Sequence, residues 1–487
     1  MSEIEFWNHW MSDYKGLLKH SGNYLASTIA TKALSFVSIP VYTSLLSVSD
    51  YGVFNVFLST VDIAAVLLTL NSEVAVSRYF YDAKDETDFK RFVGTSSVLS
   101  FSIFAFLSLA LVLLRGPFSQ LLGFERLLTV AIIPMALFTI LNNFFQQIYQ
   151  PQMQSRKIAV VSCLQAYITF GLSVVFILLM KEKRYYGQVC GSIATMTLIG
   201  TYYITQIRKY AILCFDKKYL KYIFGYTLPY LPYSLSGIIL IQFGKLIISN
   251  QEGFELAGQY SFASNIALLM MVLISVIHSA WNPYYFRYMD AKDYKSVDND
   301  YDLLWRVTLV CGLLLSLFGY EIGAILGRPA YTPSLYLVPV LVLGYIFYQW
   351  SYVYIRNVAY AKKTIWNAIV VISSGIVNIL LNSMLIGKYH ELGVACSFSI
   401  SYLFMLLLSW AVNKWILKVY APPVRKFLLP LLITVPVLAF AIYMRRFPKF
   451  SFVVVLEKLA VAMVFSVILM FNFIRKWLQR RSHAQES

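Results

Sequence analysis

Long apolar runs alternate with short polar turns along most of the 487-residue chain. A run of roughly 20 apolar residues is long enough to cross the hydrocarbon core of a bilayer as a helix. The pattern predicts an all-α polytopic membrane protein with about fourteen transmembrane helices. They are expected at 18–46, 52–76, 92–114, 127–149, 158–180, 187–206, 223–249, 258–282, 305–326, 335–357, 365–386, 393–413, 427–444 and 451–474.

Composition supports this class and gives the orientation. The chain is 59% hydrophobic and 13% charged, which is too apolar for a soluble protein of this length. A net charge of +17 would suit nucleic acid, but the cations lie in short loops between apolar runs. With the N-terminus inside, 28 of the 41 Lys and Arg residues fall on the cytoplasmic side and 10 in outer loops. We therefore expect both termini in the cytoplasm, no cleavable signal peptide and no nucleic-acid partner.

An internal repeat indicates two similar halves. Three landmarks share one gapless offset of 206 residues, with an even number of predicted helices between the copies. They are YGQVC at 186–190 with LGVAC at 392–396, Gly52 with Gly258, and Arg156-Lys157 with Lys362-Lys363. Such a repeat is parallel, so its halves would be related by a pseudo-twofold axis along the membrane normal.

The repeat predicts the domain organisation. Two six-helix bundles are followed by two extra C-terminal helices that lie outside the repeat. The expected parts are a cytoplasmic N-terminus (1–16), the N-terminal bundle (17–210), a cytoplasmic linker (211–222), the C-terminal bundle (223–416), the two extra helices (417–476) and a cytoplasmic tail (477–487).

Polar and charged residues inside the spans are the candidate functional residues. A charge near the bilayer centre costs about 2.5–3.5 kcal/mol on insertion scales, so it needs a partner or a wet cavity. Amides and hydroxyls also hold helices together, but here they recur on corresponding helices of both halves. The residues expected to line a lumen are Lys32, Asp62, Lys245, Arg356, Asn143, Gln146, Gln349, Tyr352 and Asn378. Asp62 and Glu73 are the candidate coupling acids for an ion gradient.

Matching prolines indicate where helices bend. Pro40 lies in the first predicted helix, and Pro229 with Pro232 lies in its repeat mate. Proline removes a helix hydrogen bond and kinks the chain, so these residues are candidate gating kinks.

Enzyme chemistry has no support in the sequence. No HExxH, GxSxG, P-loop or GxGxxG motif occurs, and no loop is long enough to form a soluble domain. We expect no metal, no cofactor and no catalytic residue. The lone His278 is interpreted as a packed or hydrogen-bonded residue, with a proton relay as the alternative. The five cysteines are interpreted as small packing residues.

Several stretches resemble one transporter family. IPVYTSLLSVSDYGVFNVF with SRYFYDAKDETDFKR, QIYQPQMQSRK, and SSGIVNILLNSMLIGKYHELGVACSFSISY are similar to the Wzx-type flippases of lipid-linked oligosaccharides. These belong to the multidrug/oligosaccharidyl-lipid/polysaccharide exporter (MOP) superfamily. The resemblance covers most of 17–416.

The resemblance implies alternating access in the bacterial cytoplasmic (inner) membrane. The implied substrate is an undecaprenyl-pyrophosphate-linked repeat unit of O-antigen, capsule or exopolysaccharide, whose sugar and pyrophosphate would occupy a cationic lumen. A proton or sodium gradient is the expected energy source. A polysaccharide polymerase and a chain-length regulator are the expected protein partners.

Three other functions remain open. A lipid II flippase of the same superfamily would also have fourteen helices. A drug or cation antiporter typically has twelve, and the cationic candidate lumen disfavours cationic drugs. A polymerase or ligase would carry a large outer loop, which this sequence lacks.

Overall fold

The computed structural model describes residues 30–31, 33–423 and 452–485. The described residues are helical with short connections and contain no strand, which confirms the all-α class. They pack as two compact units, with the division between Gly258 and Gln259. Each unit is described separately below.

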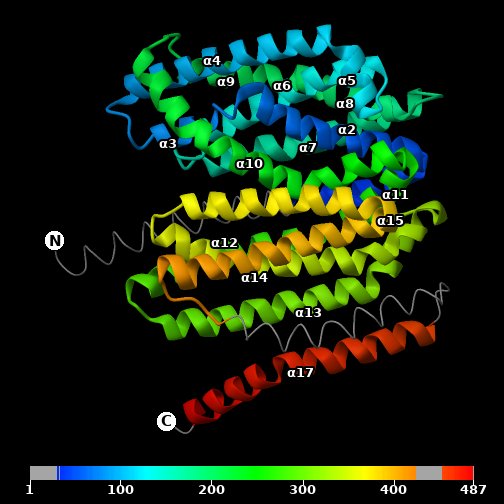
Figure 1. Cartoon of the computed structure of the whole chain (residues 1–487), viewed down its shortest axis with the longest axis vertical. Coiled ribbons are helices and arrows are strands. Elements are labelled where there is room, and N and C mark those ends of the chain that lie inside the picture. The colour runs from blue at the N-terminus through cyan, green and yellow to red at the C-terminus, as the bar shows by residue number, and fades with distance from the viewer. Residues whose placement is uncertain (1–29, 32, 424–451, 486–487) are drawn as a thin grey trace. The chain divides into compact units, whose positions relative to one another are not determined.

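The first unit is a helical bundle, coloured blue to green in Figure 1. Its first described helix, Ala33–Leu45, is followed by a Ser47 N-cap whose hydroxyl accepts from the Asp50 amide. The remaining helices are α2 (Val48–Thr69), α3 (Val74–Tyr79), α4 (Glu86–Leu113), α5 (Arg115–Leu122), α6 (Arg126–Tyr149), α7 (Ser155–Leu179), α8 (Tyr185–Thr195), a π-helical turn (Met196–Gly200), α9 (Thr201–Tyr210) and α10 (Lys217–Gln251). Helix α11 (Phe254–Ala267) begins in this unit and ends in the second.

The second unit continues with long helices, coloured green to red in Figure 1. They are α12 (Leu269–Asp290), α13 (Tyr294–Leu326), a 3-10 segment (Pro329–Leu337), α14 (Val338–Tyr360), α15 (Ile365–Ala411), a π-helical turn (Val412–Leu417) and α17 (Phe452–Gln485). Helix α15 contains two helices with a break at His390, where φ is 49°. Figure 1 shows them as two helices that run alongside each other.

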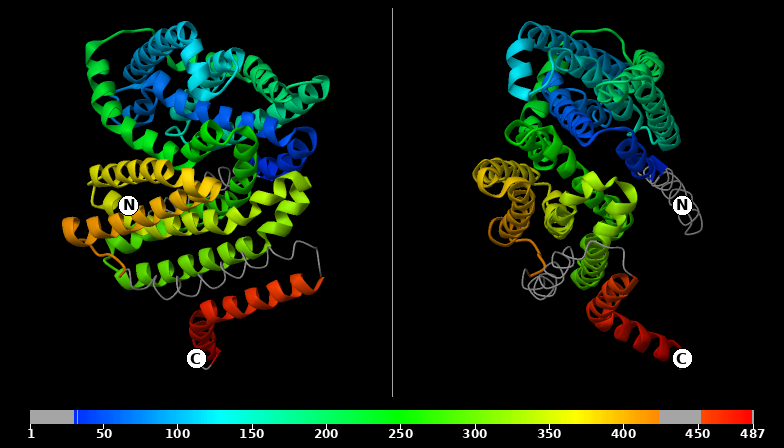
Figure 2. Two further views of the ribbon diagram at one scale, coloured as in Figure 1. Left: turned by 45° about the vertical axis from the view of Figure 1, so that its right-hand side comes forward. Right: turned by 90° about the vertical axis from the view of Figure 1, so that its right-hand side faces the viewer.

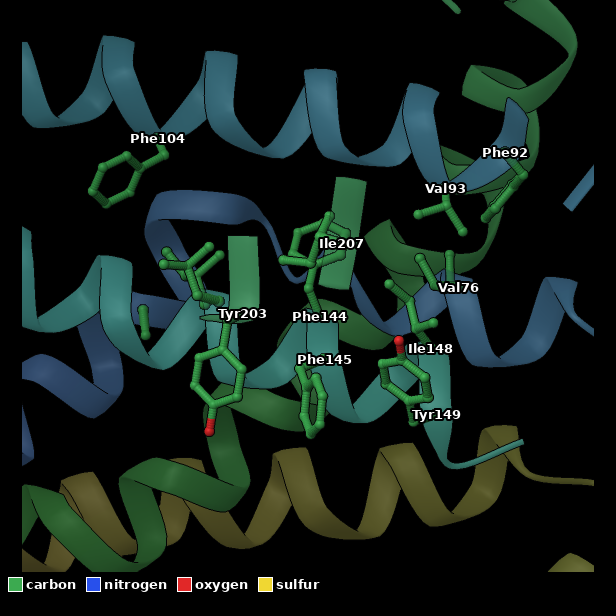
Figure 3. Close-up of a cluster of buried hydrophobic side chains, with 14 of the residues drawn as sticks. Val76, Phe92, Val93, Phe104, Phe144, Phe145, Ile148, Tyr149, Tyr203 and Ile207 are labelled. Atoms are coloured by element: carbon green, nitrogen blue, oxygen red, sulfur yellow. The ribbon is translucent and has the colours of Figure 1, made fainter. Parts of the chain in front are cut away.

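The core of the first unit forms around α6, which is apolar on several faces. Phe144, Phe145 and Ile148 of α6 are at most 1% exposed. Figure 3 shows them among side chains of α4 and α9, including Phe92 and Tyr203. Half of the α6 residues are buried, and amides on this buried face need partners inside the protein.

The helices agree with the predicted spans in type and place. Nine helices or helix groups in the described residues are long and apolar enough to cross a membrane, and Ala33–Leu45 is a shorter apolar helix. The predicted sixth span is divided by the π-helical turn, and the short α5 was not expected. The thirteenth span, 427–444, lies outside the described residues. The full count of fourteen remains a prediction.

Helix α10 runs without interruption through Pro229 and Pro232. Figures 1 and 2 show that this helix bends along its length. Proline is the ordinary cause of such a bend, because it removes one helix hydrogen bond and clashes with the preceding turn. Pro40 lies inside Ala33–Leu45.

Two glycines bring α2 and the start of α11 into backbone contact within the first unit. A Cβ on Gly52 would lie 1.9 Å from the carbonyl oxygen of Phe254. A Cβ on Gly258 would lie 2.2 Å from the carbonyl oxygen of Val48. Val48 and Phe254 are separated by the same 206 residues as the two glycines, so the contact is reciprocal. Reciprocal contacts between equivalent residues are the pattern that a two-fold axis generates.

The other glycine landmark also lies at a close helix contact. A Cβ on Gly187 of α8 would lie 2.5 Å from the Ile177 nitrogen of α7, and a Cβ on Gly393 would lie 2.5 Å from the Leu385 oxygen across the break of α15. Both glycines thus permit a tight helical hairpin. These contacts support the 206-residue repeat. The predicted boundary between its halves, at 211–222, differs from the division between the packing units because α10 packs on α2.

Candidate functional site

A chain of polar side chains joins α2 to α10 in the first unit. Gln242 of α10 donates from Nε2 to Oδ2 of Asp62 at 2.8 Å. The same amide accepts at Oε1 from the Ser59 hydroxyl at 2.9 Å. Both α2 residues belong to the polar stripe of that helix, so the stripe faces α10.

Lys245 lies on α10 one turn beyond Gln242 and is 8% exposed. Its ammonium and the Asp62 carboxylate attract each other. No ion pair within 4 Å is formed by Lys245 in the described part of the chain. The two charges therefore attract each other at a separation larger than a direct salt bridge.

Glu73 lies in the turn between α2 and α3 and is 1% exposed. Its Oε1 accepts from Asn143 Nδ2 of α6 at 3.3 Å. Its Oε2 is buried and has no hydrogen-bond partner among the described residues. An acid in this state differs sharply from Asp62, because no cation compensates it.

Two further amides of α6, Asn142 and Gln146, bond to neighbours inside the first unit. Gln146 donates to the Asn142 side-chain oxygen at 3.2 Å. The Tyr203 hydroxyl of α9 contacts the same oxygen and donates to Gln165 of α7 at 2.6 Å. Gln146 thus belongs to a network that links α6, α7 and α9.

A second polar cluster lies between α12 and α14 in the second unit. His278 of α12 donates from Nε2 to the side-chain oxygen of Gln349, and its ring stacks on Tyr352. The Tyr352 hydroxyl donates to the Asn282 side-chain oxygen at 3.0 Å. Gln349 is also the repeat mate of Asn143, because 206 residues separate them. At this position of the repeat, the first unit has Asn143 bonded to Glu73, and the second unit has Gln349 bonded to His278. Both partners are titratable side chains.

Arg356 extends this cluster with a cation. Its guanidinium lies 4.6 Å from the centre of the Tyr352 ring and donates from Nη2 to the Tyr352 hydroxyl. Its Nε is buried without an acceptor, and no described carboxylate lies within 4 Å. A guanidinium that retains an unused donor suits a phosphate or carboxylate ligand.

Two of the predicted lumen residues stand apart from these clusters. Asn378 of α15 is 1% exposed and bonds to Ser401 and Asn382 of the same hairpin, which is the arrangement of a helix-packing amide. Lys32 lies outside the described residues.

Sequence reasoning missed Gln242. Gln242 lies three residues before Lys245 on one helix face, and that spacing is the signal that would have found it. His278 is packed and hydrogen-bonded, as expected, and its partners are two of the predicted lumen residues. In the described residues, no group of three or more His, Cys, Asp or Glu side chains is arranged to hold a metal.

These clusters define a chemical class. Amides, hydroxyls and aromatic rings are groups that can bind sugar hydroxyls, and cations such as those of Lys245 and Arg356 are groups that can bind phosphate. Long apolar helices that carry such groups in their interior define a multi-pass membrane transporter.

A family model described as "Polysaccharide biosynthesis protein" matches residues 17–289. The chain belongs to this family. A curated relative, the "Lsg locus putative protein 1" of Haemophilus influenzae, is 23% identical over 292 residues, which cover 57% of this chain and 67% of the relative.

Solved structures confirm the fold. The inward closed conformation of the lipid II flippase MurJ has a TM-score of 0.68 and 17% identity, and the match covers 93% of this chain and 99% of that chain. An inward-facing multidrug resistance MATE family transporter of the MOP superfamily has a TM-score of 0.62 and 13% identity, with coverage of 81% and 97%. Both solved structures are of membrane transport proteins, and this chain shares their fold.

Proposed function

We propose that the chain moves an undecaprenyl-pyrophosphate-linked oligosaccharide repeat unit across the bacterial inner membrane by alternating access. Membership in the polysaccharide biosynthesis family is the observation that carries the proposal. The side chains agree with it, because Arg356 keeps an unused buried donor and Lys245 lacks a direct ion pair among the described residues. Both suit a pyrophosphate.

The polar clusters would bind the sugars, while the prenyl tail stays in lipid. Amides at Asn143, Gln146 and Gln349 and the ring of Tyr352 supply the hydrogen bonds and stacking that sugars use. The bend of α10 at Pro229 and Pro232, with Pro40 in the first helix, would serve as the gate. Both termini would lie in the cytoplasm.

The test is a strain from which the gene is deleted. The expected result is loss of one surface polysaccharide and accumulation of its lipid-linked precursor in the cytoplasmic leaflet, with both reversed by the cloned gene. Normal surface polysaccharide in the deletion strain would overturn the proposal. A polymerase and a chain-length regulator are the proposed partners, which co-purification from the wild-type strain would test.

A lipid II flippase is the second candidate, and the structural similarity to MurJ favours it. The two functions differ in what depletion does to the cell. Depletion of a lipid II flippase lyses cells, whereas loss of an O-antigen, capsule or exopolysaccharide flippase removes a polysaccharide. The MATE likeness alone would allow a drug antiporter, for which the deletion strain would show drug sensitivity with normal polysaccharide.

A further inference from the structure

Glu73 and Asp62 have opposite surroundings, although both are acids in the polar stripe of the first unit. Asp62 receives a hydrogen bond from Gln242 and is attracted by the Lys245 ammonium. Its negative charge is therefore partly compensated by groups inside the protein. In the described part of the chain, the donors near the Glu73 carboxyl are neutral: the Asn143 amide, the backbone N–H of Glu73 and the Thr69 hydroxyl. Its Oε2 has no hydrogen-bond partner there.

We propose that Glu73 is the residue that takes up and releases the coupling ion, that this ion is a proton, and that Asp62 is a fixed partner of Lys245. This inference rests on the proposed transport function. A buried carboxylate without a cation is strongly disfavoured, so the neutral acid is the form that fits the observed environment.

The groups around Glu73 favour a proton over a sodium ion. Sodium requires several oxygen ligands, as other hard cations do. Asn143 presents an N–H donor to Glu73, and a donor repels a metal ion. The Thr69 hydroxyl is close, but it donates to the Ala65 carbonyl oxygen at 3.1 Å. A proton needs no further ligands, because it binds to a carboxylate oxygen of Glu73 itself.

Charged groups on the packed helices do not compensate Glu73. Helix α3 packs against α4, α6 and α10, and α2 leads into its turn. Arg78 of α3 pairs with Asp82, Lys90 of α4 with Glu86, and Lys218 of α10 with Asp88. The other charged groups on these elements are Asp50 and Asp62 of α2, Arg91 of α4, Arg126 of α6, and Lys217, Lys221 and Lys245 of α10. None of them interacts electrostatically with the Glu73 carboxylate, whose interactions are hydrogen bonds.

The turn that carries Glu73 contacts three helices at once. Leu70 and Asn71 adopt left-handed backbone conformations with φ of 50° and 59°. Asn71 donates to Ser234 of α10 at 2.7 Å, and the carbonyl oxygen of Ser72 accepts from Ser96 of α4 at 3.2 Å. Asn143 of α6 completes the set. A movement of Glu73 would therefore reach α6 through Asn143, and it would reach α10 and α4 through the neighbouring Asn71 and Ser72.

Proton release converts this contact into a switch. The proton leaves the Glu73 acid for water, and a carboxylate remains where no cation of the described residues compensates it. That state is stable only if the turn moves the carboxylate toward water, which shifts the helices bonded to the turn. Uptake of a proton reverses the change. Coupling thus follows from the cost of burying an uncompensated charge.

Infrared spectroscopy of the purified full-length protein tests the inference directly. At neutral pH, the wild-type protein should show the carbonyl band of a buried protonated carboxylic acid. Glu73→Gln should remove the band and Glu73→Asp should shift it. Asp62→Asn should leave it in place. Loss of the band in Asp62→Asn, or its retention in Glu73→Gln, would overturn the assignment.

The deletion strain provides the second measurement. Glu73→Gln should lose nearly all complementation at wild-type protein levels. External pH should no longer affect the residual export of polysaccharide. Glu86→Gln, which changes an exposed acid of α4, should complement normally. Normal complementation by Glu73→Gln would refute the inference alone. Normal polysaccharide in the deletion strain itself would refute the proposed function and leave the infrared result standing.

Discussion

At the scale of single residues, the clearest functional signal is a cation with an unused donor. Arg356 contacts the ring and hydroxyl of Tyr352, and its Nε is buried without an acceptor. A buried donor that lacks a partner costs about 1–3 kcal/mol, and a ligand oxygen recovers that cost. The unused donor of Arg356 supports its proposed role in ligand binding.

Arg356→Ala should impair polysaccharide export strongly while the protein level stays normal. A charge-assisted hydrogen bond contributes about 1.5–3 kcal/mol, which corresponds to roughly tenfold or more in substrate affinity. Arg356→Lys should restore only part of the activity, because an ammonium cannot bind phosphate in a bidentate way. Lys363→Ala, at an exposed cation seven residues along the chain, is the control. Full export by Arg356→Ala would exclude this residue from the site.

Asp62 and Lys245 should behave as a compensated pair. Lys245→Met leaves the Asp62 charge without compensation and should destabilise the protein by about 3 kcal/mol, and Asp62→Asn should also destabilise it. The double variant should be more stable than the sum of the single effects predicts. The measurement is the thermal stability of the purified wild type, the two single variants and the double variant in detergent. Strict additivity would show that the two charges do not interact.

At the scale of elements, tight backbone contacts determine which helices can pack. Gly52 and Gly258 each lie against a carbonyl oxygen of the opposite helix. The sequence predicted that these glycines correspond, from the repeat alone. It could not predict that they touch, because a repeat register gives equivalence and not distance. Gln242 was missed for a similar reason, since its role depends on which face of α10 meets α2.

Gly52→Ala and Gly258→Ala should both be harmful, and to a similar extent. The added Cβ would fall within 2.2 Å of backbone oxygen in each case, and backbone cannot move aside cheaply. Overpacking costs typically 1–3 kcal/mol, so each variant should lose roughly 3 kcal/mol of stability. Gly171→Ala is the matched control, because nothing lies within 4 Å of a Cβ there. Equal thermal stability of all three variants would contradict the backbone contact.

An ion pair joins two loops that are predicted to lie on the outer side. The Lys183 ammonium donates to the Glu125 carboxylate, and this bond lowers the pKa of Glu125 and raises that of Lys183. Its stabilisation is fully present above the ordinary Glu pKa of 4.5 and is lost as the pH falls through the lowered value. It is also lost at alkaline pH, as the pH rises through the raised pKa of Lys183.

Glu125→Gln should therefore be less thermostable than wild type at neutral pH, and the difference should vanish on acidification. The pair is exposed, so the difference should be small and should shrink at high salt. Melting temperatures of both proteins across pH measure it. A difference that persists at acid pH would require another cause.

At the scale of the whole molecule, the sequence predicted the class, the family and nearly all described helices. Membrane helices are predictable because lipid requires long apolar runs with internal hydrogen bonds. Side-chain partners are less predictable, because the sequence pattern around an intramembrane Glu is the same whether or not a cation lies against it. Glu73 and Asp62 were equal candidates in the sequence, and only their neighbours separate them.

The parallel repeat makes a prediction about topology that can be checked with pairs of sites. Glu182 and Lys388 differ by 206 residues, as do Lys84 and Asp290, and all four are exposed. A parallel repeat with cytoplasmic termini places the first pair outside and the second pair inside. An inverted repeat would place the members of each pair on opposite sides.

Single cysteines at these four positions, in a chain whose five native cysteines are replaced, distinguish these arrangements. A membrane-impermeant maleimide added to intact spheroplasts should label Glu182→Cys and Lys388→Cys. Lys84→Cys and Asp290→Cys should react only after the membrane is opened. If Lys84→Cys and Asp290→Cys reacted in intact spheroplasts and the other two did not, the termini would lie outside and the repeat would still be parallel. If the two members of either pair reacted differently from each other, the parallel repeat would be refuted. The lumen prediction depends on this result, because Asn143 and Gln349 line one lumen from equivalent positions only if the two halves share one orientation.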